Sequence, residues 1–131
     1  QAHPPGGTNF SKISLEFFDK FETWVLNPNT NIEYEAPVGR YVVDALVPKH
    51  KVVIEFLGDY WHGNPEVFDS GKINPTTGKP FGDLWFKTLD KFHDLIKQGF
   101  RIFYIWENDY KKKGLKGLQS YGCYNIFEDS L

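Results

Sequence analysis

Apolar residues recur at three- and four-residue steps between Ser11 and Leu26, and this spacing predicts an amphipathic helix. Ser11 is expected to be its N-cap, since a serine hydroxyl can accept a hydrogen bond from a backbone N–H of the first turn. Pro28 is expected to end it, because proline cannot continue the helical hydrogen-bond ladder. The apolar stripe consists of Ile13, Phe17, Phe21, Trp24 and Val25.

A second stripe predicts a helix from Leu84 to Gln98, with Asp83 as its N-cap and Gly99 as its stop. The segment 63–82 before it is rich in Gly, Pro, Asn and Thr and is expected to be a long loop. The stripe consists of Trp85, Leu89, Phe92 and Ile96.

Segments rich in β-branched and aromatic residues predict strands at 40–47, 51–57 and 100–106, and a short mixed segment, 31–36, is expected to add another. Pro48-Lys49-His50 has the length of a hairpin connection. The strands at 40–47 and 51–57 carry apolar residues at both odd and even positions, so we expect both faces of the sheet to be covered. This order of elements predicts an α/β fold with a mixed central sheet flanked by helices.

With 131 residues, 40% apolar and 18% aromatic, the chain can bury one core of ordinary size. Residues 1–10 are expected to be a linker or tail and residues 11–131 one domain. The absence of methionine and the start at Gln1 indicate a piece of a longer protein or a processed chain. No apolar run is long enough to span a bilayer, so no membrane association is expected. The single cysteine, Cys123, cannot form an internal disulfide, which is typical of the cytoplasm. The net charge of −2 gives no global basic field for nucleic acid.

Two acids interrupt the apolar strands. Asp44 lies within Val-Val-Asp-Ala-Leu and Glu55 within Val-Ile-Glu-Phe-Leu. Burying an unpaired carboxylate lowers the stability of the fold by roughly several kcal/mol. Each of the two acids therefore needs a cation, hydrogen-bond donors or a raised pKa. Across a short turn the two acids can converge, and a hard divalent cation would then relieve their repulsion. The alternative is that each acid forms its own ion pair with Lys or Arg, or points outward at a sheet edge.

A histidine follows the second of these strands, within Gly58-Asp-Tyr-Trp-His-Gly63. Histidine can take a proton from water near neutral pH, and this is the task that metal-assisted phosphodiester cleavage sets. His62 is therefore a candidate base, with a structural hydrogen-bond donor as the alternative.

These residues resemble a known family. Asp44, the run from Val52 to Gly63, and the strand that ends in Trp106-Glu107 are similar, in this order, to the Vsr branch of the PD-(D/E)XK nucleases. The resemblance is closest to phage-type homing endonucleases with an EDxHD active site. It implies a restriction-endonuclease-like core and a metal-dependent DNA endonuclease, in the cytoplasm of a bacterial or phage-infected host cell.

The resemblance also implies roles for individual residues. Asp44 matches the central metal-binding aspartate, Phe56 the residue whose main-chain carbonyl contacts the metal, and His62 the water-activating histidine. Glu16 matches the leading glutamate and a further metal contact, and Asp90 matches the acid that orients the histidine.

Alternatives remain for the last two residues. Glu16 can form a surface ion pair with Lys20, one helical turn away. Asp90 lies opposite the apolar stripe of its helix, on a face that it shares with Asp94. The alternative for Asp90 is an ordinary solvent-exposed charge on the helix surface.

The chain departs from the family in two respects. Leu57 stands where the superfamily usually has a lysine, so His62 would have to replace that group, and Glu55 is either an extra metal ligand or only a strand acid. One cysteine cannot build the structural zinc site of Vsr repair enzymes, which favours the homing branch over mismatch repair. Because all the implied ligands are oxygens, Mg²⁺ is the expected ion, with Mn²⁺ as a substitute.

The expected partner is double-stranded DNA. Tyr60 and Trp61 resemble an aromatic pair that enters the base stack, and Trp85 either matches a third aromatic or packs in the core. The basic run is expected to anchor phosphates, with a solvated surface as the alternative; it consists of Lys111, Lys112, Lys113 and Lys116.

Other interpretations of the oligomeric state and of the function remain open. A homodimer is compatible with the sequence, and further DNA-recognition segments are expected outside this fragment. The competing functions are a mismatch-repair nicking enzyme and a catalytically decayed DNA-binding module on the same scaffold.

Overall fold

The computed structural model describes residues 10–122, so residues 1–9 of the expected linker and Cys123 lie outside it. In chain order the elements are α1 Lys12–Trp24, β1 Glu33–Val38, β2 Tyr41–Val47, β3 Val52–Leu57, α2 Asp59–His62, α3 Phe81–Lys97, β4 Arg101–Trp106, α4 Glu107–Lys113 and β5 Gln119–Ser120. Short 3₁₀ turns lie at Pro48–His50 and Gly114–Gly117.

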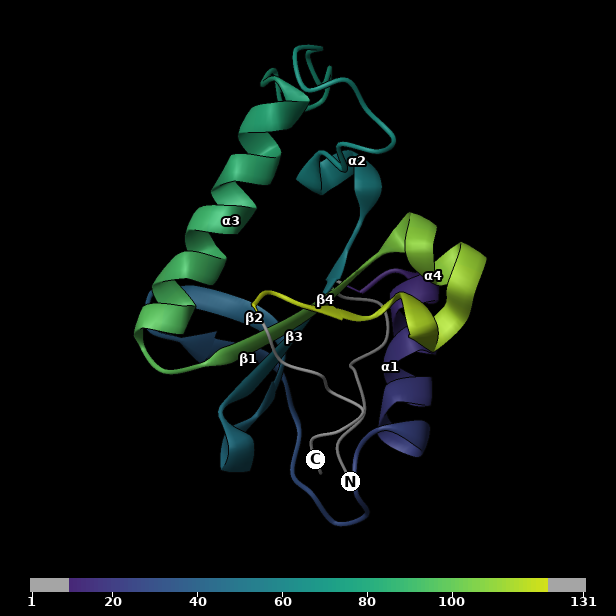
Figure 1. Ribbon diagram of the computed structural model, residues 1–131, viewed down its shortest axis with the longest axis vertical. Coiled ribbons are helices and arrows are strands. Elements are labelled where there is room, and N and C mark those ends of the chain that lie inside the picture. Colours follow the sequence, from purple (N-terminus) through teal and green to yellow (C-terminus); the bar gives the residue numbers. More distant parts are fainter. Residues whose placement is uncertain (1–9, 123–131) are drawn as a thin grey trace.

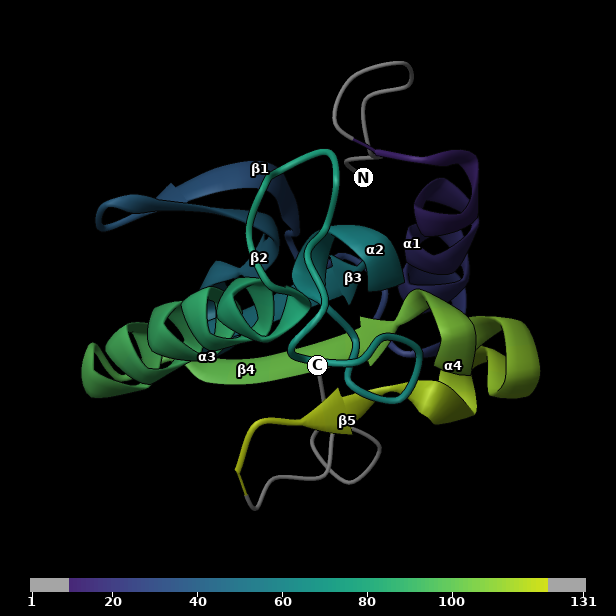
Figure 2. The same cartoon turned by 90° about the horizontal axis from the view of Figure 1, so that it is seen from above.

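The five strands form one mixed sheet in the order β1-β2-β3-β4-β5. Only β3 and β4 are parallel; the other neighbouring pairs are antiparallel. Helices α1 and α4 lie on one side of the sheet and α3 on the other (Figures 1 and 2). The predicted α/β class, with a mixed sheet flanked by helices, is confirmed.

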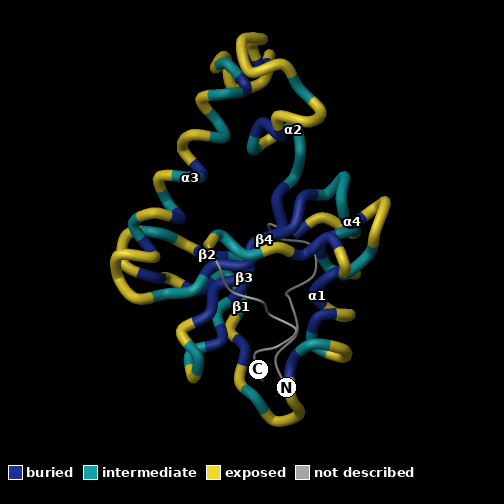
Figure 3. The backbone as a smooth tube through the Cα atoms, viewed as in Figure 1, coloured by how far each residue is buried: buried dark blue, intermediate teal, exposed yellow. Residues whose placement is uncertain are grey.

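Each side of the sheet has its own core. On the α1 side, aromatic residues of α1 pack against β3 and β4; we call this the α1-side core, and its fully buried members include Phe17, Phe18, Phe21, Ile54 and Phe103. The α3-side core contains Val43, Val53, Phe92, Leu95 and Ile102. Strand β3 is buried along its whole length (Figure 3), so the prediction that both faces are covered holds for β3. On β2 it fails at Val42, which is 61% exposed.

The first helix follows the prediction at its start and departs from it at its end. Ser11 is the N-cap and accepts a hydrogen bond from the N–H of Ser14. Trp24, expected on the apolar stripe, is 75% exposed, whereas Phe18 is fully buried. The buried face is therefore rotated by part of a turn from the expected one. Phe10, assigned to the linker, is buried instead and packs edge-on against Phe18.

The other elements show smaller differences. Strand β1 begins two residues later than expected, and α3 begins at Phe81 with Pro80, not Asp83, at the N-cap position. Asp83 lies in the first turn of α3, where its negative charge still favours the helix N-terminus. Gly99 ends α3 with a φ of 93°, as predicted. Over residues 10–122 no helix is long and apolar enough to cross a membrane.

Candidate active site

Strand β2 is irregular at Asp44. Val43 packs in the α3-side core and Ala45 in the α1-side core, although residues two apart on a regular strand share a face. The β1–β2 ladder passes from the Tyr34–Ala45 pair to the Ala36–Val43 pair, and the intervening residue of β1, Glu35, has a φ of 48°. The backbone of Asp44 is thus turned out of the regular ladder.

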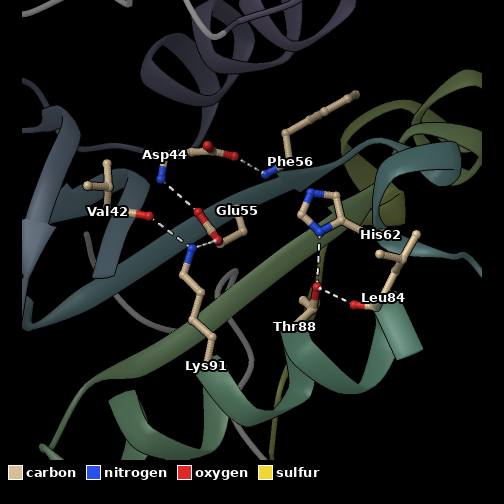
Figure 4. A network of polar contacts seen from close by, with 8 residues as sticks. All are labelled: Val42, Asp44, Glu55, Phe56, His62, Leu84, Thr88 and Lys91. Atoms are coloured by element: carbon tan, nitrogen blue, oxygen red, sulfur yellow. Dashed lines mark hydrogen bonds and ion pairs between the residues drawn. The ribbon is translucent and has the colours of Figure 1, made fainter. Parts of the chain in front are cut away.

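The two strand acids accept hydrogen bonds from backbone N–H groups at the point where the pairing of β2 with β3 ends. The last residue pair of the β2–β3 ladder toward this end is Ala45–Ile54. Beyond it, the N–H of Asp44 donates to Glu55 Oε2 at 2.7 Å, and the N–H of Phe56 donates to Asp44 Oδ2 at 2.8 Å (Figure 4). This exchange explains how two carboxylates are accommodated in strands that are otherwise apolar.

The two carboxylates face opposite sides of the sheet. The side chain of Asp44 points toward α1, whereas that of Glu55 points toward α3 and meets Lys91 (Figure 4). Lys91 Nζ lies 2.5 Å from Glu55 Oε1 and donates to the Val42 carbonyl at 2.9 Å. Glu55 is 3% exposed and fully engaged by the Lys91 ammonium and the Asp44 N–H. The ion-pair alternative therefore describes Glu55 in this structure, and its carboxylate lies on the other side of the sheet from that of Asp44.

Replacing Lys91 by methionine should lower the free energy of unfolding by about 3–5 kcal/mol, because it leaves the buried Glu55 carboxylate without its cation. Urea denaturation measures this loss. Lys87→Met is the matched control, because Lys87 is exposed one turn earlier on α3, and it should change stability by less than about 0.5 kcal/mol. Equal small effects of the two substitutions would show that the ion pair contributes nothing.

Asp44 lines a cavity of about 300 Å³ at the end of β3. Its Oδ2 accepts from Phe56, and its other carboxylate oxygen accepts no hydrogen bond within residues 10–122. Burial and the neighbouring negative charge of Glu55 raise the pKa of Asp44 well above its ordinary value, more than the Phe56 N–H and Lys91 lower it. The carboxylate therefore gains from a cation. The cavity is also lined by Ser14, Trp61, His62 and Glu107.

The short helix α2 brings His62 to the same cavity. Nδ1 of His62 lies 3.0 Å from the hydroxyl of Thr88 on α3, and that hydroxyl donates to the Leu84 carbonyl at 3.2 Å. Because the Thr88 proton is used on Leu84, Nδ1 carries the imidazole proton and Nε2 has the free lone pair. Figure 4 shows this second nitrogen on the side of the ring toward Asp44 and Phe56.

His62 is held neutral. Burial, and secondarily the positive charge of Lys91, lower its pKa to about 4. A neutral imidazole with a free Nε2 can accept a proton at pH 7.

Gly63 fixes where α2 ends and so where His62 lies. It adopts a φ of 65°, and a Cβ atom here would lie 2.0 Å from the backbone oxygen of Phe81. Only glycine allows this close approach of α2 to the start of α3.

The structure does not bring Glu16 or Asp90 to this cavity. Glu16 is exposed, pairs with Lys20 at 3.1 Å, and borders a separate surface hollow beside α4. Asp90 is exposed on α3. It lies two residues beyond Thr88, a rotation of about 200° around the helix, so Thr88 contacts the imidazole and Asp90 faces away.

The aromatic residues divide between structure and surface. Tyr60 donates to or accepts from the Thr76 hydroxyl at 2.6 Å and packs edge-on against Phe81, so its ring is used by the fold. Trp61 is 55% exposed at the cavity. Trp85 packs on Trp106 with ring centroids 4.9 Å apart, which supports the core-packing alternative for it.

The sequence analysis assigned no role at the site to three residues that lie at or beside it: Thr88, Lys91 and Glu107. Glu107 begins α4, lines the cavity with Asp44, and pairs with Lys111 at 3.3 Å. Its position directly after the apolar β4 strand was the available signal. The predicted basic run lies at the other end of α4, where Lys112 and Lys113 are exposed.

The donor set at the cavity is compatible with Mg²⁺. Within the described part of the chain no three His, Cys, Asp or Glu side chains gather closely enough to hold a metal ion. Asp44 offers one carboxylate oxygen, and the Phe56 carbonyl faces the same side of β3 as the Phe56 N–H that Asp44 binds. Mg²⁺ characteristically takes one or two protein oxygens and completes its shell with water and substrate phosphates.

Comparison of the chain with models of protein families, with curated proteins and with solved structures found no match.

Proposed function

We propose that this chain is the Vsr-like catalytic domain of a metal-dependent DNA endonuclease, and that it belongs to a homing, mobile-element enzyme. The observation that carries the proposal is one cavity of about 300 Å³ lined by an acid with an open oxygen and by a neutral histidine. Asp44 is suited to a divalent cation, and His62 to accepting a proton from water. The order of elements, with a mixed sheet between helices, is compatible with a PD-(D/E)XK core.

The protein's own groups divide the work of hydrolysis. Nε2 of His62 takes the proton of the attacking water, and the Thr88 hydroxyl keeps the ring in place while it becomes positively charged. Asp44 and the Phe56 carbonyl would hold Mg²⁺, with Glu107 facing the same cavity. A bound Mg²⁺ supplies neutralisation of the phosphate charge and orientation of the water. Lys91 keeps Glu55 paired on the α3 side of the sheet, and its positive charge also lowers the pKa of Asp44, although by less than burial and Glu55 raise it.

DNA contacts would be local, because the net charge is −2. Helix α4 begins at the cavity with Glu107 and ends in three lysines. These lysines would bind DNA phosphates one helix length away from the cavity. Trp61 is the exposed aromatic group nearest the reacting residues, as the neighbour of His62.

Nicking of supercoiled plasmid tests the proposal. The full chain should convert plasmid to the nicked form with Mg²⁺ or Mn²⁺ and should lose this activity in EDTA, because the phosphate charge is then not neutralised. Asp44→Ala and His62→Ala should each abolish nicking while the urea unfolding midpoint stays within the range of folded variants. Retained nicking in both variants would end the assignment.

The competing function is a DNA-binding module that has lost catalysis. It is favoured by Leu57 at the usual lysine position and by the occupation of Glu16 and Glu55 in ion pairs. That module would bind DNA equally with and without Mg²⁺ and would nick nothing.

A further inference from the structure

A second cavity shares two of its walls, Trp61 and His62, with the cavity that Asp44 lines. It measures about 420 Å³ and lies between β2, α2 and the first turns of α3. Tyr41 and Leu84 give it apolar walls, and Lys87 lines it as well. The volume accommodates a nucleoside-sized group.

The two cavities carry opposite charge. Acids line the first one, whereas lysines and no acid line the second. Lys91 is neutralised by Glu55, but Lys87 forms no ion pair with any residue between 10 and 122. Lys87 is therefore the lysine of this cavity whose charge is not compensated by an acid among residues 10–122. An anion can pair with it, so the second cavity is suited to a negatively charged ligand.

The wall between the cavities presents an indole on a rigid support. Trp61 is 55% exposed, and its ring meets the Tyr60 ring edge-on at 5.0 Å. Tyr60 is itself fixed by the Thr76 hydroxyl and by Phe81. A large exposed aromatic side chain that is held in place by its neighbours is suited to stacking on a planar ring of a ligand.

We propose that the second cavity receives one nucleotide of the DNA strand, adjacent to the scissile phosphate and turned out of the base stack, with its base against Trp61 and its phosphate at Lys87. A base inside a duplex is covered on both faces by its neighbours, so stacking on an indole requires it to leave the stack. The inference rests on the proposed function, because it takes His62, which lines both cavities, to be the general base that activates water for attack on the neighbouring phosphate.

Binding without metal and without cleavage tests the proposal separately from nuclease activity. The probe is a single-stranded tetrathymidylate, titrated in EDTA into the ¹⁵N-labelled full chain and followed by NMR. The indole N–H of Trp61 and the amides of Leu84 and Lys87 should shift saturably. Trp61→Ala should weaken binding by about 10- to 100-fold, the effect of losing one stacked base. Lys87→Gln should reduce the slope of log affinity against log salt by about one.

Trp24→Ala is the matched control, because Trp24 is an even more exposed tryptophan, 75% exposed on α1, and lines neither cavity. It should leave binding unchanged. The proposal is overturned if Trp61→Ala binds as the wild type does, or if inorganic tripolyphosphate alone reproduces the Trp61 shift. Plasmid nicking without nucleotide binding at Trp61 would remove only this inference. Nucleotide binding without nicking would keep a nucleotide site at Trp61, but it would remove the catalytic proposal and with it the place of this site beside a scissile phosphate.

Discussion

Asp44→Asn is expected to lower the rate of DNA cleavage by at least about 10²- to 10³-fold, the usual cost of losing one group that stabilises charge in the transition state. The amide still accepts the hydrogen bond from the Phe56 N–H, so the strand connection is retained. What is lost is the negative charge at the open oxygen. Plasmid nicking measures the rate, and calorimetric titration with Mn²⁺ measures the accompanying loss of affinity. Asp19→Asn, an exposed acid of α1, is the control and should behave as the wild type.

The pH dependence provides a second readout of Asp44. Its pKa is raised, so the unliganded carboxylate is protonated over a wider range than an ordinary aspartate, and cleavage should fall as the pH falls through this raised pKa. Because cations compete with protons for a ligand, higher Mg²⁺ should move the acid limb to lower pH. An acid limb that does not respond to Mg²⁺ would contradict the role of Asp44 as a ligand.

His62→Gln is expected to lower cleavage by about 10²- to 10⁴-fold, the range of general-base contributions, with a smaller effect on DNA binding. Glutamine keeps a polar group near Thr88 but cannot take a proton from water. In the wild type, NMR titration of the imidazole should give a pKa of about 4, so His62 is in its base form throughout the neutral range. The acid limb of cleavage should therefore follow Asp44 and not His62.

Thr88 and Asp90 separate the structural account of His62 from the sequence-based one. Thr88→Val removes the hydroxyl that holds Nδ1 and should reduce kcat by more than it changes KM, because the ring loses its fixed tautomer. Asp90→Asn should leave both parameters unchanged, since Asp90 is exposed and turned away from the ring. The opposite result would restore Asp90 as the orienting acid.

Local patterns predicted most of the secondary structure. The Ser11 cap, the two apolar strands joined at Pro48-Lys49-His50, and the Gly99 stop depend on neighbours within a few residues, and these were correct. The four-residue helix α2 and the start of α3 were not foreseen, because the short turn and Pro80 carry little periodic signal.

The candidate site was predicted less completely, since it depends on contacts between distant parts of the chain. The Glu55–Lys91 pair joins residues 36 apart, so a sequence pattern could identify the acid but not its partner. The choice of Thr88 over Asp90 depends on the rotation of α3 about its axis. The separation of Asp44 from Glu55 depends on the irregularity of β2 at Asp44, which no local signal predicts.

The most direct measurement is a crystal of the protein soaked in Mn²⁺, whose anomalous scattering marks the ion. We predict a peak between the free carboxylate oxygen of Asp44 and the main-chain carbonyl of Phe56, next to Nε2 of His62. An ion bound elsewhere, with Asp44 unchanged at saturating Mn²⁺, would contradict the central claim that this cavity is a metal-dependent phosphodiesterase site.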